Sequence, residues 1–221
     1  TIPNISGKIV VLIHGLCMND RQWLQTRKDG SKHDHGAALQ HDFGYTPIYL
    51  HYNTGLNITN NGEQFSTLLE ELTQAWPVAI EEIVSKLEHS WPAFTQKIVF
   101  LGTPHHGAPL ERGGHWFDSL LGATPYAAPF AKIGKIRSAG ITDLRYGYIL
   151  DADEVPVPLP DKIQCFAIAG STSDDGDALH GDGLVQVNSA LGVHEDEKRS
   201  LGFAKRQQFI LHATNHIQLL G

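Results

Sequence analysis

The chain has 221 residues and a formal net charge of −7, with hydrophobic residues at 41% and charged residues at 19%. This length suits one domain with a substantial core, and the composition excludes a disordered chain. The acidic balance argues against nucleic acid as a partner, because a polyanion needs a basic face. No apolar run reaches the about 18 residues that a spanning helix needs, so we expect no transmembrane segment.

The two cysteines, Cys17 and Cys165, fall on separate expected elements, and we interpret both as reduced, partly buried thiols. Residues 1–8, TIPNISGK, contain no apolar signal core. These features leave the oligomeric state open and do not fix the compartment, for which we favour the cytoplasm slightly over secretion.

Strand and helix signals alternate along the first third of the chain. Residues 8–13, KIVVLI, form a continuous β-branched run that is typical of a strand buried on both faces. The next expected elements are a short helix at 19–24 that Asn19 and Asp20 can cap, a helix ending near Gly44, and a strand at 46–52.

A long helix is expected to open at Asn61-Gly62 and to end before Pro77. Within it, four apolar residues recur at helical spacing, and we interpret them as a stripe that packs on the core. They are Phe65, Leu68, Leu69 and Leu72.

Three further strands are expected at residues 97–101, 163–169 and 207–211. Strands that alternate with helices predict an α/β fold with a mostly parallel central sheet. Residues 105–160 are punctuated by glycine and proline and are too long for a plain connection. We interpret them as a helical cap or lid over a site at the carboxyl ends of the strands, within one domain spanning 1–221.

Three stretches with chemically useful side chains directly follow expected strands. His14-Gly15 ends the first strand in a flexible loop, where a backbone N–H can point at a developing oxyanion. Gly181-Asp182-Gly183 sets a carboxylate on a short loop, and His216 follows the last strand. Taken singly, the three stretches could equally be a plain loop, a surface turn and a structural histidine.

Four segments together resemble the bacterial lipase and esterase branch of the α/β-hydrolase fold, from about Lys8 to the end of the chain. They are IVVLIHGLCMNDRQW, VFLGTPHHGAPLERGG, GDGLVQVNSALG and LHATNHIQLL. In that fold the catalytic residues follow one another along the chain as nucleophile, acid and histidine, and here the acid also precedes the histidine. The resemblance implies a serine-type carboxylic ester hydrolase that forms an acyl-enzyme with a small-molecule or lipid ester and needs no cofactor.

The resemblance also implies a role for each matching residue. Asp182 would be the catalytic acid that orients an imidazole, and His216 would be the general base. The backbone N–H of Leu16 would donate to the oxyanion, with His14-Gly15 shaping its loop. His105 and His106 would belong to the wall of the substrate cleft.

No metal site is predicted. Relatives that bind calcium carry an acid two positions after the catalytic histidine, where this chain has Gln218, a weaker ligand for a hard cation. Zinc ligands could be drawn from two histidine groups, but adjacent histidines more often line a cleft or the surface. The two groups are His105-His106 with His115 and Asp118, and His33-Asp34-His35.

The nucleophile is the missing part, because the sequence contains no Gly-x-Ser-x-Gly. The nearest stretch is 88–92, EHSWP, in which Ser90 is flanked by Glu and Pro where the glycines belong. If residues 81–84 begin the central strand, only the six residues 91–96 separate Ser90 from the next strand, too few for a crossover helix.

Three explanations stay open for this junction. A segment of the natural molecule is absent from the sequence, the gene carries a real deletion, or another serine such as Ser66 or Ser171 is the nucleophile. The intact acid, base and oxyanion stretches favour the first explanation. The alternative function is a non-catalytic binding protein or pseudoenzyme with the same fold.

Overall fold

The computed structural model describes residues 5–15, 18–27, 29–83, 91–107, 157–173 and 181–220. Its strands are β1 (Lys8–Ile13), β2 (Gln25–Thr26), β3 (Lys32–His33), β4 (Thr46–Leu50), β5 (Glu82–Ile83), β6 (Lys97–Leu101), β7 (Gln164–Gly170) and β8 (Gln208–Leu211). Its α-helices are α1 (His35–Phe43), α2 (Ile58–Ala75) and α5 (Val187–Ala190). Short 3-10 turns lie at Asp20–Trp23, Trp91–Phe94, Glu197–Arg199, Lys205–Gln207 and Gln218–Leu220.

The predicted α/β class with parallel strands is confirmed, and within the described residues the strands fit the expected mostly parallel central sheet only loosely. Parallel strands form two three-stranded sheets, in the orders β4-β1-β5 and β6-β7-β8, beside a small antiparallel β2-β3 hairpin. β5 pairs with β1 over only two residues. In the described ranges no ladder joins β5 to β6.

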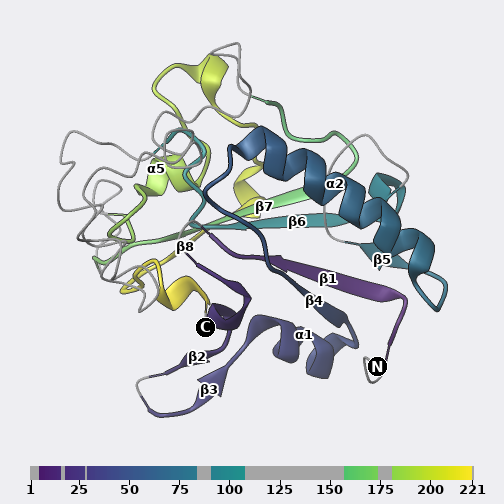
Figure 1. Cartoon of the computed structure of the whole chain (residues 1–221). Coiled ribbons are helices and arrows are strands. Elements are labelled where there is room, and N and C mark those ends of the chain that lie inside the picture. Colours follow the sequence, from purple (N-terminus) through teal and green to yellow (C-terminus); the bar gives the residue numbers. More distant parts are fainter. Residues whose placement is uncertain are drawn as a thin grey trace.

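The two longer helices lie on opposite faces of the first sheet (Figure 1). The β1-α1-β4 and β4-α2-β5 connections step across this sheet in opposite directions, and right-handed crossovers then place their helices on opposite sides. Asp34 caps α1 by accepting a hydrogen bond from the Ala37 N–H at 2.9 Å, and Gly44 ends it at φ 74° as predicted.

Helix α2 begins earlier than the sequence indicated. Its cap is Asn57, whose side chain accepts a hydrogen bond from the Asn60 N–H at 2.9 Å, so the predicted start at Asn61-Gly62 is wrong. Leu69 is buried as expected, but Leu68 is exposed, which corrects its place in the core stripe. Adjacent helical residues are rotated by about 100°, so both cannot face the core equally.

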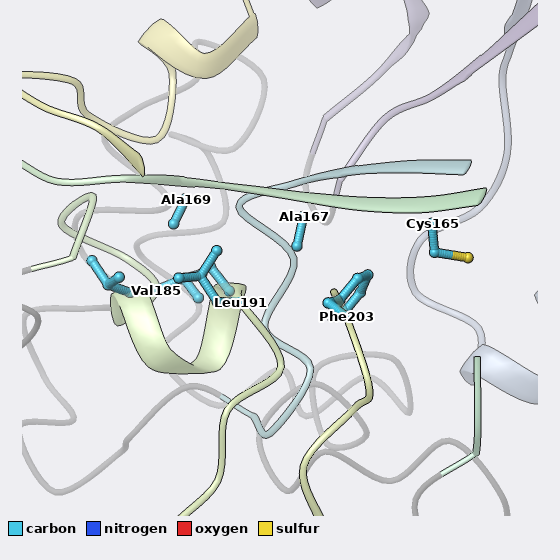
Figure 2. Packing of buried hydrophobic residues seen from close by; sticks show 8 residues of the cluster. Cys165, Ala167, Ala169, Val185, Leu191 and Phe203 are labelled. Atoms are coloured by element: carbon cyan, nitrogen blue, oxygen red, sulfur yellow. The ribbon is translucent and has the colours of Figure 1, made fainter. Parts of the chain in front are cut away.

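Small residues of β7 allow close packing on one face of the second sheet. Cys165, Ala167 and Ala169 point toward α5 and the ring of Phe203, and they belong to one buried cluster (Figure 2). Because side chains alternate along a strand, the opposite face carries a different set. Three residues of that face are exposed, namely Val99, Phe209 and Leu211.

Two contacts link the first sheet to the second half of the chain. Leu101 of β6 packs against the buried cluster that contains Leu12 and Trp23. His35 Nε2 donates a hydrogen bond to the Leu219 carbonyl at 3.1 Å, which brings the C-terminal residues beside the β2-β3 region (Figure 1). These contacts place the ends of β1, β6 and β7 near one another.

Several expectations concern residues outside the described ranges. They include most of the cap at 105–160, the thiol of Cys17, the oxyanion residue Leu16 and the candidate nucleophile Ser90. Expected strand boundaries elsewhere differ from the structure by one or two residues. None of the helices within the described ranges is long and apolar enough to cross a membrane.

Candidate active site

Asp182 lies on a tight turn beyond the carboxyl end of β7. The Thr172 N–H donates to the Gly181 carbonyl at 2.7 Å, and the Asp182 N–H donates to the Val185 carbonyl at 3.1 Å. Gly181 has a φ of 52° and no room for a Cβ, which would collide with the Val185 carbonyl oxygen. Glycine is therefore required at this position to present the carboxylate.

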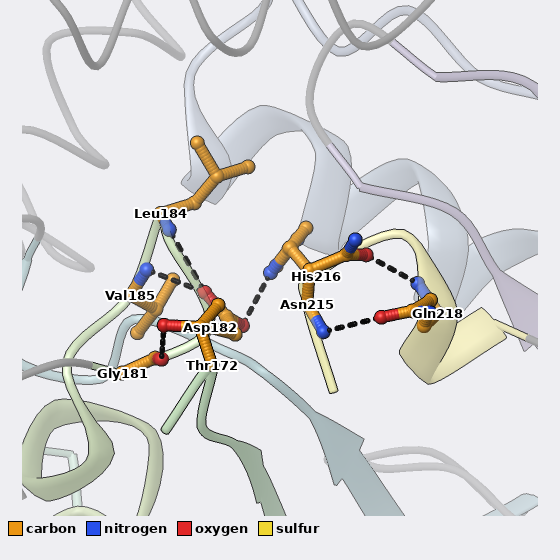
Figure 3. A network of polar contacts seen from close by, with 8 residues as sticks. All are labelled: Thr172, Gly181, Asp182, Leu184, Val185, Asn215, His216 and Gln218. Atoms are coloured by element: carbon orange, nitrogen blue, oxygen red, sulfur yellow. Dashed lines mark hydrogen bonds and ion pairs between the residues drawn. The ribbon is translucent and has the colours of Figure 1, made fainter. Parts of the chain in front are cut away.

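The side chain of Asp182 is fully buried, and both of its carboxylate oxygens are hydrogen-bonded (Figure 3). Oδ1 accepts from the backbone N–H groups of Leu184 at 2.9 Å and Val185 at 2.8 Å. Oδ2 accepts from His216 Nδ1 at 2.7 Å. Burial would penalise an unpaired carboxylate, and these three donors compensate its lost hydration.

His216 sits on a loop that several backbone contacts hold beside Asp182. The Thr214 N–H donates to the Ser171 carbonyl at 2.8 Å, and the His216 N–H donates to the Asp182 carbonyl at 3.0 Å. The imidazole side chain is 22% exposed. Since a carboxylate only accepts, Nδ1 carries the proton, and Nε2 keeps a lone pair that can act as a base.

Gln218 lies two positions after His216, where calcium-binding relatives carry an acid, and it makes hydrogen bonds with Asn215. Gln218 Oε1 accepts from the Asn215 N–H and Asn215 Oδ1 accepts from the Gln218 N–H, both at 2.9 Å (Figure 3). The two amides close the loop around His216 reciprocally. Gln218 thus makes a structural contact within the loop.

Two glycines form the floor of this site, and reasoning from sequence missed both. A Cβ on Gly102 would lie 2.9 Å from Asp182 Oδ2 and 3.0 Å from His216 Nδ1, and its φ is 56°. A Cβ on Gly170 would lie 2.8 Å from the Thr214 carbonyl oxygen. The signal was present, because each glycine directly follows an apolar strand run.

His14 lies at the end of β1 and is 3% exposed. Its Nδ1 donates to the Gly15 carbonyl at 3.1 Å, and its ring stacks on Tyr52 with centroids 4.5 Å apart. Burial lowers the pKa of His14, and the neighbouring His51 adds to that effect. A neutral ring is therefore favoured in this loop, where an oxyanion donor was predicted.

His105 and His106 pack on the second sheet and its neighbours. The His105 ring lies between Phe100 and Phe203, with centroid distances of 4.8 Å and 5.5 Å. The His106 N–H donates to Ser189 Oγ at 3.3 Å. Within the described residues, no hydrogen bond joins either ring to the Asp182–His216 pair, so their predicted contact with substrate stays a prediction.

Burial of His105 predicts a specific pH dependence of stability. It lowers the His105 pKa from 6.5 to about 4, whereas the unfolded chain binds the proton near 6.5. The free energy of unfolding should therefore fall by up to about 3 kcal/mol as the pH drops from 6.5 to 4. Urea titrations across this range should show a smaller loss for His105→Phe, which keeps the aromatic packing.

The matched control is His41→Gln, because the His41 side chain is 87% exposed. That variant should keep the pH dependence of the unmodified chain. Equal slopes for His105→Phe and the unmodified chain would mean that His105 is not the group responsible.

The other serines considered as nucleophiles are poorly placed. Ser66 is buried in the middle of α2, away from any strand-to-helix turn. Ser171 follows β7 and is fully buried, with its Oγ 3.0 Å from Ser173 Oγ. Neither serine has the exposed hydroxyl that a nucleophile needs.

His33 and His35, from the second group considered as zinc ligands, contact each other. His33 Nε2 and His35 Nδ1 are 3.2 Å apart, and His35 Nε2 is bonded to the Leu219 carbonyl. Over the ranges that the structure describes, no group of three or more His, Cys, Asp or Glu side chains is arranged to hold a metal ion.

No family model matches this chain, and no curated protein matches it. The mature form of the lipase BlEst2 from Bacillus licheniformis is similar in structure, with a TM-score of 0.60 and 18% identity over 99% of this chain and 87% of the lipase. Its propeptide form gives a TM-score of 0.57 and 16% identity, and this chain spans 48% of it. These neighbours show a lipase-like α/β fold.

Proposed function

We propose that this chain is a carboxylic ester hydrolase of the lipase or esterase type, with Asp182 as the acid and His216 as the base. The observation that carries the proposal is the 2.7 Å hydrogen bond between a buried carboxylate and a partly exposed imidazole beyond the ends of parallel strands. Open α/β sheets bind their ligands at that edge. The lipase-like fold agrees with this assignment.

The hydrogen bond from His216 to Asp182 leaves the other ring nitrogen, Nε2, free to accept a proton in this proposal. With Nδ1–H donated to Asp182, His216 Nε2 would take the proton of a nucleophilic hydroxyl as it attacks the ester carbonyl. The imidazolium, stabilised by Asp182, would return that proton to the leaving alcohol. Water would then hydrolyse the acyl-enzyme by the same steps, with the N–H of Leu16 donating to both oxyanions.

The substrate of this proposal is an apolar ester, either a small molecule or a lipid, and residues 105–160 would cap its site within a single domain. No cofactor enters the reaction, because every proton moves between the substrate, water and this chain's side chains. Nucleic acid is not a partner in this scheme.

The position of β5 bears on the nucleophile. It lies next to β1 at the edge of the first sheet, so a strand-to-helix turn after Ile83 would follow a strand beside β1. Ser90 is the candidate that the present sequence offers after this strand. A longer natural segment at the same junction, carrying a Gly-x-Ser-x-Gly turn, would supply the nucleophile without moving Asp182 or His216.

One observation favours a second function. Because the sequence contains no Gly-x-Ser-x-Gly, a pseudoenzyme that binds ligands without covalent chemistry fits the same fold. Such a protein would keep the cleft and its hydrogen-bonded histidine but would form no acyl-enzyme.

A fluorophosphonate probe separates the two functions. For the hydrolase we expect one label per chain on a single serine, and loss of that label in His216→Ala. Ser90→Ala then tests whether Ser90 carries it. The control Ser31→Ala removes an exposed turn hydroxyl and should label normally. Mass spectrometry of the intact chain reads the result against the unlabelled mass of 24.3 kDa. An unlabelled natural protein of that mass would reject the hydrolase and support the binding protein. A heavier natural protein that is labelled outside these 221 residues would identify the absent segment.

A further inference from the structure

Tyr52 makes two contacts with the loop that follows β1. Its hydroxyl donates to the His14 carbonyl at 2.7 Å, and its ring stacks on the His14 imidazole at an interplanar angle of 27°. Burial raises the pKa of Tyr52 to about 12, so the phenol keeps its proton and remains a donor at neutral pH. One side chain thus holds both the backbone and the ring of His14.

His14 passes this restraint to the next peptide. The Gly15 carbonyl oxygen accepts from His14 Nδ1 at 3.1 Å and from the Met18 N–H at 3.2 Å. A carbonyl only accepts, so His14 must carry its proton on Nδ1. In a planar trans peptide the N–H points opposite to the C=O, so a restraint on a carbonyl is also a restraint on the amide of the same peptide.

We propose that Tyr52 is a positioning residue for the oxyanion donor, holding His14 so that His14 in turn fixes the Gly15 carbonyl. This inference rests on the proposed hydrolase function for its effect on rate. Within the described residues, Tyr52 makes no hydrogen bond or ring contact with Asp182 or His216, and it acts through His14. Donors that are oriented before the reaction stabilise a developing charge without the cost of reorganisation.

The adjacent histidine has a different role. His51 Nδ1 bonds to Asp20 Oδ1 at 2.7 Å, and the His51 side chain is largely exposed. Its ring centroid lies 6.2 Å from that of His14, against 4.5 Å for Tyr52. Tyr52 is therefore the residue that restrains the loop directly.

The test removes one oxygen atom from each of two tyrosines. Tyr52→Phe keeps the stacked ring and loses the hydrogen bond to His14, and we expect kcat for a short-chain ester to fall about tenfold with KM unchanged within about twofold. This is less than the about 10²–10³ that follows from deleting a donor outright. The control Tyr49→Phe loses a hydrogen bond to Asp34 and should leave kcat unchanged.

Amide hydrogen exchange provides a readout that does not need catalysis. In Tyr52→Phe the Met18 amide, which donates to the Gly15 carbonyl, should exchange about tenfold faster because the loop loses its restraint. In Tyr49→Phe its exchange should not change. Faster Met18 exchange in a chain without hydrolase activity would reject the proposed function and keep the restraint by Tyr52. Unchanged exchange, or a fall in kcat matched by Tyr49→Phe, would overturn the role of Tyr52.

Discussion

Replacing Asp182 by Asn should lower the rate of ester hydrolysis by about 10⁴-fold, the size of effect that the same change has on other acid–histidine pairs. The structure gives the reason. Oδ1 accepts from two backbone N–H groups, of Leu184 and Val185, so the amide oxygen of Asn must stay on that side. The NH₂ group then faces His216, which must accept through Nδ1 and carry its proton on Nε2, where it cannot act as a base.

Asp161→Asn is the matched control, because it makes the same substitution at an exposed turn before β7. Its rate should equal that of the unmodified chain. Steady-state hydrolysis measures the effect, and ¹⁵N shifts of the His216 ring report the change of tautomer even in a slow variant. A rate within tenfold of the unmodified chain, or an unchanged tautomer, would contradict the assignment of Asp182 and His216.

Gly102→Ala should reduce both stability and activity. The new methyl group would meet Asp182 Oδ2, His216 Nδ1 and the Leu219 side chain at 2.9–3.0 Å, and Ala would have to adopt a φ of 56°. We expect a loss of about 2–4 kcal/mol in the free energy of unfolding, combining backbone strain with displaced contacts. Hydrolysis should fall at least about 10²-fold, because a shift of 1 Å in catalytic geometry has that effect.

Gly30→Ala is the control that separates backbone strain from displaced side-chain contacts. Gly30 has a φ of 82°, but nothing lies within 4 Å of its hypothetical Cβ, so its substitution reports strain alone, of about 1 kcal/mol. Chemical denaturation and ester hydrolysis should be measured on both variants. Equal effects on stability and activity at Gly30 and Gly102 would show that Gly102 does not support the acid–base pair.

Most elements of the fold could be predicted from local patterns. The β-branched run at 8–13 became β1 at the expected residues, and Gly44 ended α1 because only a left-handed residue completes that cap. The start of α2 was misplaced because Asn57 and Asn61 offer similar local signals, and the hydrogen bond to Asn60 selects Asn57. Which strands pair with one another depends on contacts between segments that are distant along the chain, and periodicity within a strand does not encode them.

For the candidate site, sequence order identified Asp182 and His216, which the structure brings to within 2.7 Å across a separation of 34 residues. It gave no indication of Tyr52 or Gly102, whose importance comes from neighbours that are distant along the chain. Tyr52 acts through a hydrogen bond to a backbone carbonyl and Gly102 through its lack of a side chain, and neither feature can be predicted from residue type alone. Three-dimensional packing is what brings Tyr52 next to His14 and Gly102 next to Asp182 and His216.

The reciprocal amide pair of Asn215 and Gln218 has a consequence for titrations. Both side chains are neutral, so neither ordinary pH changes nor added salt alters their charge or screens their contact. Titration of this amide pair would consequently not loosen the segment that supports His216.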